Sequence, residues 1–151
     1  MTASTKSGST RTAGTETNGA AAVADADVVR ALFAAFASGD LAALSDVLDP
    51  DATWHHHNDD RLGGSHRGAD AVIAYLTESA LLTAGTLRAE PRSVMTDGAG
   101  HVAVPVRLSA SRPDGRTMDG PQVLLVTVAN GRVRAIEQFV GDPPAVAAFW
   151  A

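Results

Sequence analysis

Three turn signals in the second half of the chain constrain its fold more than any other feature. Asp97-Gly98, Pro113-Asp114-Gly115 and Asn130-Gly131 are sequences typical of tight turns and hairpins, and 16 or 17 residues separate one from the next. This spacing leaves room for long strands between the turns. We therefore predict four long antiparallel strands that follow one another as a meander.

Apolar residues between the turns support the same prediction. From residue 101 to residue 108 a branched apolar side chain occupies every second position, residues 123–128 form a nearly continuous apolar run, and residues 136–140 close the set. Strands this long twist and curl, and Pro105 marks a bulge or an edge. A curled sheet that helices close leaves a conical cavity on its concave face, which is the default ligand site.

Helical spacing replaces this alternation in the first half of the chain. From Val28 to Phe36 apolar residues recur at every fourth position, with others beside them, so one face of a helix is apolar. Asp25 or Asp27 can cap the start of this helix, and Gly39 can end it. We expect the folded domain to begin with this helix.

Two more helices and a short strand follow. Asp40 caps a short helix that Pro50 stops, and residues 52–57 form a strand. A polar loop then leads to a third helix, which starts near Ala69 and turns Leu76 inward. Helices followed by a run of strands predict an α+β domain.

The first 24 residues differ in composition from the rest. Eighteen of them are Ser, Thr, Ala or Gly. Such a segment cannot bury enough apolar surface to offset the entropy of ordering it. We expect residues 1–24 to form a disordered tail and residues 25–151 to form the domain, with docking to a partner as the alternative role of the tail.

Charge and cysteine usage exclude several classes of protein. The net charge of -5 at pH 7 argues against binding to nucleic acid or to an anionic membrane. The chain has no Cys, which excludes disulfides, thiolate catalysis and cysteine zinc sites. It has neither an apolar run of membrane-spanning length nor the apolar core of a secretory signal. We expect a cytoplasmic protein.

Four motifs carry a family resemblance. They are Trp54-His55 after Asp51-Ala52-Thr53, the run from Gly64 to Gly68, Asn130-Gly131-Arg132-Val133, and Gly141-Asp142 with Phe149-Trp150 behind it. Over about residues 25–151 the chain resembles the nuclear transport factor 2-like fold, and within it the SnoaL-like polyketide cyclase and ketosteroid-isomerase-like group. His66 stands where the family commonly has Tyr.

The resemblance implies a cone-shaped, curved antiparallel sheet, with four meander strands and a short strand, packed against about three helices. It also implies a homodimer that packs the exposed faces of its sheets, and no metal or other cofactor. Steroid isomerases of this fold use an oxyanion-binding Tyr, whereas the first helix here offers Phe33 and Phe36. Epoxide hydrolases of the fold have Arg two residues before Asp on a strand, and here that spacing occurs only at Arg112-Pro113-Asp114, in a turn. Both of these chemistries are disfavoured.

The run His55-His56-His57 is the most unusual local feature. On a strand, His55 and His57 share one face, while His56 lies with Trp54 on the other. The pair His55 and His57 could ligate a metal given a third ligand, could lie near solvent at a strand end, or could transfer protons in the cavity. All three interpretations remain open.

Acidic residues on the meander are further candidates. Asp119 leads into an apolar strand, where desolvation could raise its pKa and make it an acid or base; alternatively it is a solvated turn residue. Glu137 and Gln138 interrupt the last strand, so one should face the cavity and the other the outer side. A buried Glu137 would need a partner, which Arg107 or His101 could supply as a cross-strand pair.

Aromatic residues are few, so several should line an apolar cavity. The expected substrate-binding residues are Trp54, Phe33, Phe36, Tyr75, Arg107, Gln138 and Phe139. The sequence has no glycine-rich phosphate loop, nucleophile elbow or dinucleotide motif, so no phosphate-bearing cofactor is implied.

These observations predict a cofactor-free cyclase or isomerase that acts on a hydrophobic, polyketide-like small molecule. His55 or His57, with Asp119 and Glu137, would transfer the protons. The alternative is a non-catalytic small-molecule-binding or dimerisation module of the same fold, which a cavity without an inward carboxylate or imidazole would favour.

Overall fold

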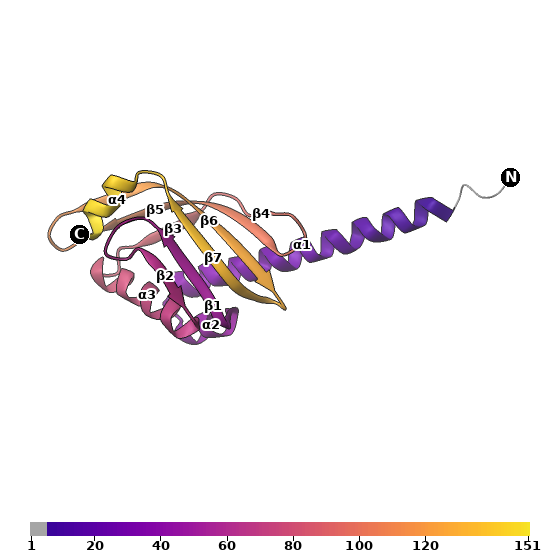
Figure 1. Ribbon diagram of the computed structural model, residues 1–151, viewed down its shortest axis with the longest axis horizontal. Helices are drawn as coiled ribbons and strands as arrows, with labels where there is room; N and C mark the ends of the chain where they lie inside the picture. The colour runs from indigo at the N-terminus through magenta and orange to yellow at the C-terminus, as the bar shows by residue number, and fades with distance from the viewer. Residues whose placement is uncertain (1–5) are drawn as a thin grey trace.

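A strongly curved sheet and the helices packed against one of its faces make up the molecule (Figure 1). The computed structural model describes residues 6–151, with side chains from residue 19 onward. The helices are α1 (Lys6–Ser38), α2 (Leu41–Val47), α3 (Ala69–Leu82) and α4 (Pro143–Trp150). The strands are β1 (Leu48–His57), β2 (Gly64–Arg67), β3 (Arg88–Pro91), β4 (Met95–Thr96), β5 (His101–Ser111), β6 (Thr117–Ala129) and β7 (Arg132–Val140). The predicted α+β class is confirmed.

The long strands form the predicted meander. The strand order is β2-β1-β7-β6-β5-β3, and β4 pairs with β5. Asn130 and Gly131 connect β6 to β7 with φ angles of 54° and 74°, as a tight hairpin turn requires. One pairing departs from the expected antiparallel sheet, because β1 and β7 run parallel. The short strand β2, which pairs with β1, was not predicted.

The first strand of the meander is broken into β3 and β4. β3 pairs with the part of β5 after Pro105, and β4 pairs with Val102 and Ala103 before it. Between them the Arg92 N–H donates to the Pro105 carbonyl at 2.8 Å. Because proline has no N–H to return, the ladder is interrupted here. Pro105 therefore marks a break in the neighbouring strand, while β5 itself continues.

The helix starts were predicted with mixed success. The Asp40 side chain accepts the Ala43 N–H at 3.0 Å and caps α2, as expected. The predicted start of the first helix at Asp25 or Asp27 is wrong, because α1 begins at Lys6. Asp25 instead accepts the N–H of Gly100 at 3.1 Å.

The predicted disordered tail overlaps α1. Its residues 6–24 belong to that helix, and residues 1–5 lie outside the described residues. The later turns of α1 pack on the sheet. The composition of residues 6–24 did not indicate that this helix continues into them. The division of the chain at residue 24 stays a prediction.

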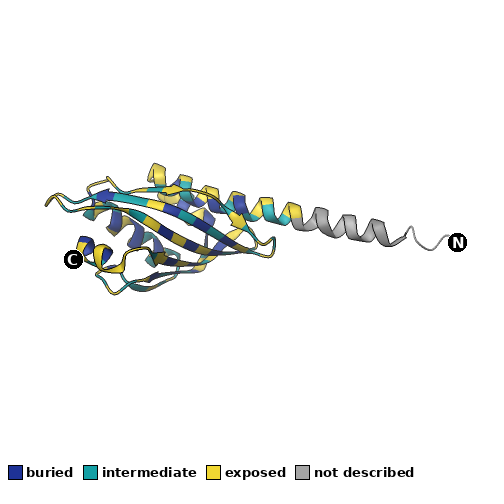
Figure 2. Ribbon diagram, turned by 90° about the horizontal axis from the view of Figure 1, so that it is seen from above, coloured by how far each residue is buried: buried dark blue, intermediate teal, exposed yellow. Residues whose placement is uncertain are grey.

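Burial alternates along the strands, where dark blue buried residues alternate with yellow or teal, more exposed ones (Figure 2). Val104, Leu124 and Ile136 are buried on the inner face, defined here as the sheet face that α1 and α3 cover. Val123, Leu125 and Phe139 are exposed on the opposite, outer face. None of the helices that the structure describes is both long enough and apolar enough to cross a membrane.

Candidate functional site

An apolar cavity of about 60 Å³ lies between the inner face, α1 and α3. Phe33 and Phe36 of α1, Leu76 of α3 and Trp150 of α4 form apolar parts of its wall. One water needs only about 10–15 Å³, so the cavity has room for more than a single water. In this form it suits a small ring compound better than a long chain.

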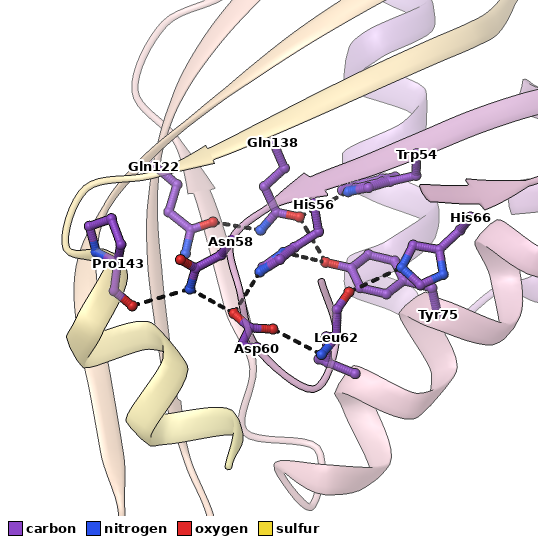
Figure 3. A network of polar contacts seen from close by, with 10 residues as sticks. All are labelled: Trp54, His56, Asn58, Asp60, Leu62, His66, Tyr75, Gln122, Gln138 and Pro143. Atoms are coloured by element: carbon purple, nitrogen blue, oxygen red, sulfur yellow. Dashed lines mark hydrogen bonds and ion pairs between the residues drawn. The ribbon is translucent and has the colours of Figure 1, made fainter. Parts of the chain in front are cut away.

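The polar part of the wall is a chain of hydrogen bonds (Figure 3). The Tyr75 hydroxyl donates to Gln138 Oε1 at 2.7 Å, and the Trp54 indole N–H donates to the same oxygen at 2.9 Å. Gln138 Nε2 then donates to Gln122 Oε1 at 2.6 Å. Tyr75, Gln138 and Gln122 all line the cavity. We refer to Asp60, His56, Tyr75, Gln138 and Gln122 as the polar chain.

A buried ionisable pair stands behind this wall. His56 Nε2 lies 2.9 Å from Asp60 Oδ2, and the two side chains are 1% and 0% exposed. His56 Nδ1 lies 3.2 Å from the Tyr75 hydroxyl. Asp60 also accepts the side-chain N–H of Asn58 at 2.7 Å and the backbone N–H of Leu62 at 2.9 Å. Every oxygen and ring nitrogen of the pair therefore has a partner.

Tyr75 keeps its proton firmly. Burial raises the pKa of its hydroxyl far above the ordinary value, the negative charge of Asp60 raises it further, and the hydrogen bond to Gln138 offsets a part. The ring of His66 stacks on Tyr75, with 4.3 Å between ring centroids. At neutral pH Tyr75 is therefore a hydrogen-bond donor and not a base.

Five of the residues expected to bind substrate line the cavity: Trp54, Phe33, Phe36, Tyr75 and Gln138. Of Glu137 and Gln138, one was expected to face the cavity and the other the outer side. Gln138 faces the cavity. The binding role of these residues stays a prediction.

The side chains expected to transfer protons lie on the outer face, and so do Arg107 and Phe139. His57 Nε2 lies 3.1 Å from Glu137 Oε1, with both side chains partly open to solvent. The Phe139 ring stacks on His57, and His55 Nδ1 lies 2.6 Å from the Ser65 hydroxyl. The structure therefore places these side chains away from the cavity. Trp54 was expected to line the cavity. Because side chains alternate between the two faces of a strand, His56 lies on the same face as Trp54, whereas His55 and His57 lie on the other.

Asp119 belongs to an exposed ion pair. Arg107 donates to both of its carboxylate oxygens, at 2.8 and 2.6 Å. This hydrogen bonding lowers the pKa of Asp119, opposite to the rise that desolvation would cause. The pair Arg107 and Asp119 is half exposed, so Asp119 is solvated, as in the alternative interpretation, although it lies on β6 and not in a turn. A catalytic role for Asp119, His55, His57 or Glu137 stays a prediction that this placement does not support.

Three members of the polar chain, His56, Gln122 and Asp60, were not among the predicted site residues. Gln122 shares the phase of Leu124 and Val126 on β6, so the alternation of the strand could have identified it as inward. Asp60 follows β1 in a polar loop and has no such signal, because its contact with His56 depends on how the loop folds back. No three His, Asp or Glu side chains in the described part of the chain gather in a way that could hold a metal ion.

A wide hollow of about 680 Å³ occupies the outer face. Its wall mixes polar side chains such as His55 and Glu137 with Met95 and Leu125. It lies across the sheet from the inner cavity and shares none of the polar chain. The inner cavity and this outer hollow are thus distinct, and of the two only the inner one is apolar and backed by a buried ionisable pair.

Comparison with known proteins identifies the family. The model of the SnoaL-like domain matches residues 29–136. The chain belongs to the SnoaL-like domain family. An uncharacterised protein of Mycobacterium tuberculosis is 41% identical over 128 residues, which cover 85% of this chain and 97% of the relative. The resemblance predicted from the four sequence motifs is therefore confirmed.

Solved structures of other proteins share the fold. Bal32a, from a soil-derived mobile gene cassette, superposes with a TM-score of 0.83 at 31% identity and covers 87% of this chain and 99% of its own. A putative polyketide cyclase from Sinorhizobium meliloti gives a TM-score of 0.62 at 25% identity, over 74% of this chain and 93% of its own. The expected nuclear transport factor 2-like fold is confirmed. The fold family includes polyketide cyclases.

Proposed function

We propose that the protein binds a small, largely apolar carbonyl compound in the inner cavity and catalyses its cyclisation or isomerisation without a cofactor. The observation that carries this proposal is an apolar cavity with one polar wall, backed by the buried pair His56 and Asp60. The likeness to a putative polyketide cyclase supports the reaction class.

The chemistry follows from the proton that Tyr75 retains. Cyclisation and isomerisation of carbonyl compounds pass through enols, in which negative charge develops on oxygen. Fixed donors in a water-poor site stabilise such charge far better than water does. Because Tyr75 stays protonated and donates to Gln138 Oε1, the hydrogen bonds of the polar chain keep one direction throughout the reaction, and the close walls hold the reacting atoms together.

A second candidate is a binding module of the same fold that does not turn its ligand over. The observation that favours it is the composition of the wall, since no carboxylate or imidazole belongs to the residues that line the cavity. His56 and Asp60 reach the cavity only through Tyr75. A base that removes a proton from carbon is therefore not in direct contact with the ligand.

Exchange of α-protons separates the two candidates. Cyclopentanone in D₂O exchanges these protons through its enol, and NMR follows the loss of signal. If the protein is an enzyme, it raises the exchange rate above the rate in buffer alone, and the Tyr75→Phe variant no longer does so. The control Glu137→Gln, on the outer face, keeps the rate. Saturable binding without faster exchange supports the module, and absence of binding contradicts both candidates.

A further inference from the structure

The hydrogen bonds of the polar chain have a fixed direction, and a single side chain sets it. The indole of Trp54 can only donate, so the Gln138 atom 2.9 Å from it must be the amide oxygen. The two ends of a Gln amide look alike, and a donor-only neighbour decides between them. The Gln138 nitrogen therefore faces Gln122, 2.6 Å away.

The same reasoning extends to Gln122. Its oxygen accepts from Gln138, so its nitrogen is the free end of the chain. Gln122 is also one of the residues that line the cavity. Among the side chains described from residue 19 onward, no hydrogen-bond partner is found for this nitrogen, and it is not one of the fully buried polar atoms that lack a partner. Gln122 thus presents a free N–H donor at the wall.

The other end of the chain has the matching direction. Tyr75 has one proton, which it gives to Gln138 Oε1. The Tyr75 oxygen can then only accept from His56, so His56 Nδ1 carries a proton. Asp60 already accepts two N–H groups, as an ionised carboxylate does. His56 Nε2 lies 2.9 Å from Asp60 Oδ2, so the His56 ring is held at both of its nitrogens.

We infer that this one-way chain makes the cavity selective for ligands with a hydrogen-bond acceptor oxygen, such as a ketone or quinone carbonyl. Gln122 Nε2 is the donor that binds this oxygen. A ligand that offers only a donor meets another donor at the wall and leaves both unpaired, which costs affinity. Trp54 and His56 act as positioning residues, because they keep the amides of Gln138 and Gln122 from turning over. The inference rests on the proposed function, since it requires that the cavity binds small molecules.

Three five-membered rings of similar size test it: cyclopentanone, which only accepts, pyrrole, which only donates, and thiophene, which does neither well. NMR titration of the full-length protein measures their affinities. We expect cyclopentanone to bind about two- to tenfold more tightly than thiophene, the gain from one hydrogen bond. Pyrrole binds no better than thiophene. In Gln122→Met, a near match in size, cyclopentanone falls to the affinity of thiophene.

The outcomes separate this inference from the proposed function. Equal binding of the three rings in the wild type, or tighter binding of pyrrole, overturns the acceptor selectivity and leaves the cavity as a binding site. Binding of none of them overturns both. In Trp54→Phe we expect the preference for cyclopentanone over pyrrole to disappear while thiophene still binds.

The hydrogen on His56 Nδ1 provides a readout that needs no variant. Long-range proton–nitrogen NMR correlation of the wild type should show a hydrogen on this ring nitrogen, because it must donate to the Tyr75 oxygen. His55 and His57, on the open outer face, serve as internal references in the same spectrum. A His56 Nδ1 without a hydrogen overturns the direction of the chain, whatever the ligands do.

Discussion

Asp60 is the residue on which the polar chain depends at its buried end. Its carboxylate holds His56, Asn58 and the Leu62 N–H, with no exposed surface on its own side chain. Removing one partner of a buried pair leaves the other charge uncompensated, at a cost of about 3–5 kcal/mol. We expect Asp60→Asn to lower the free energy of unfolding by about 3 kcal/mol, measured by urea denaturation.

Asp59 supplies the matched control for this prediction. It has the same charge, lies next to Asp60 in the chain, and is exposed. Asp59→Asn should leave the urea midpoint close to the wild-type value, because surface substitutions rarely matter. Equal losses in the two variants would show that Asp60 contributes no more than a surface charge.

A second prediction at this scale concerns acid pH. The hydrogen bond from Arg116 lowers the pKa of Asp114 from 3.8 to about 2. Since the folded pKa lies below the unfolded one, this pair stabilises the fold fully above pH 3.8 and loses that contribution as the pH falls through about 2. We expect the carboxyl carbon of Asp114 to titrate near pH 2 by NMR. Arg116→Gln should raise that midpoint towards 3.8, whereas Arg132→Gln, in the other hairpin, should not move it.

Among the elements, α4 shows how a short helix becomes part of the core. Asp142 accepts the Ala145 N–H at 3.3 Å at its start, and Phe149 and Trp150 are buried at its end. Losing an N-cap costs about 0.5–2 kcal/mol. We expect Asp142→Ala to lower the free energy of unfolding by about 1 kcal/mol in chemical denaturation. Asp142→Asn, which can still cap, should lose much less, and equal losses would exclude capping as the cause.

Local patterns predicted elements where local chemistry decides them. The Asp40 cap of α2 and the Asn130-Gly131 turn between β6 and β7 were both predicted, because each feature depends only on neighbouring residues. The break opposite Pro105 and the parallel pairing of β1 with β7 depend on strands that are distant in sequence, so no local pattern could show them. α4 was missed although Asp142 before two prolines is a helix-start signal.

The candidate site illustrates the same limit. Alternation separated His56 from His55 and His57, and it placed Gln138 opposite Glu137. It could not show that Tyr75 on α3 and Asp60 in a loop meet His56, since those contacts arise only when helix, loop and sheet pack together. The apolar wall was therefore predictable, and the polar chain was not.

At the scale of the whole molecule, the two faces of the sheet differ in what they expose. The inner face holds the cavity, and the outer face exposes Val123, Leu125 and Phe139 side by side on β6 and β7. Exposed apolar side chains gathered on one surface are typical of an interaction site. We propose, as the family resemblance implied, that two copies of the chain pack through their outer faces.

Leu125→Glu tests this dimer, because it places a charge in the centre of the apolar surface, where burial without a partner is costly. We expect the wild type to sediment as a dimer and Leu125→Glu as a monomer in analytical ultracentrifugation. Leu81→Glu is the matched control, since Leu81 is 75% exposed on α3, away from the outer face, and should remain dimeric. A monomeric wild type, or a dimer that survives Leu125→Glu, would leave the outer face without a partner of its own kind. Because the polar chain lies wholly on the inner face, the monomeric variant should still bind cyclopentanone, which makes assembly and ligand binding separable in one protein.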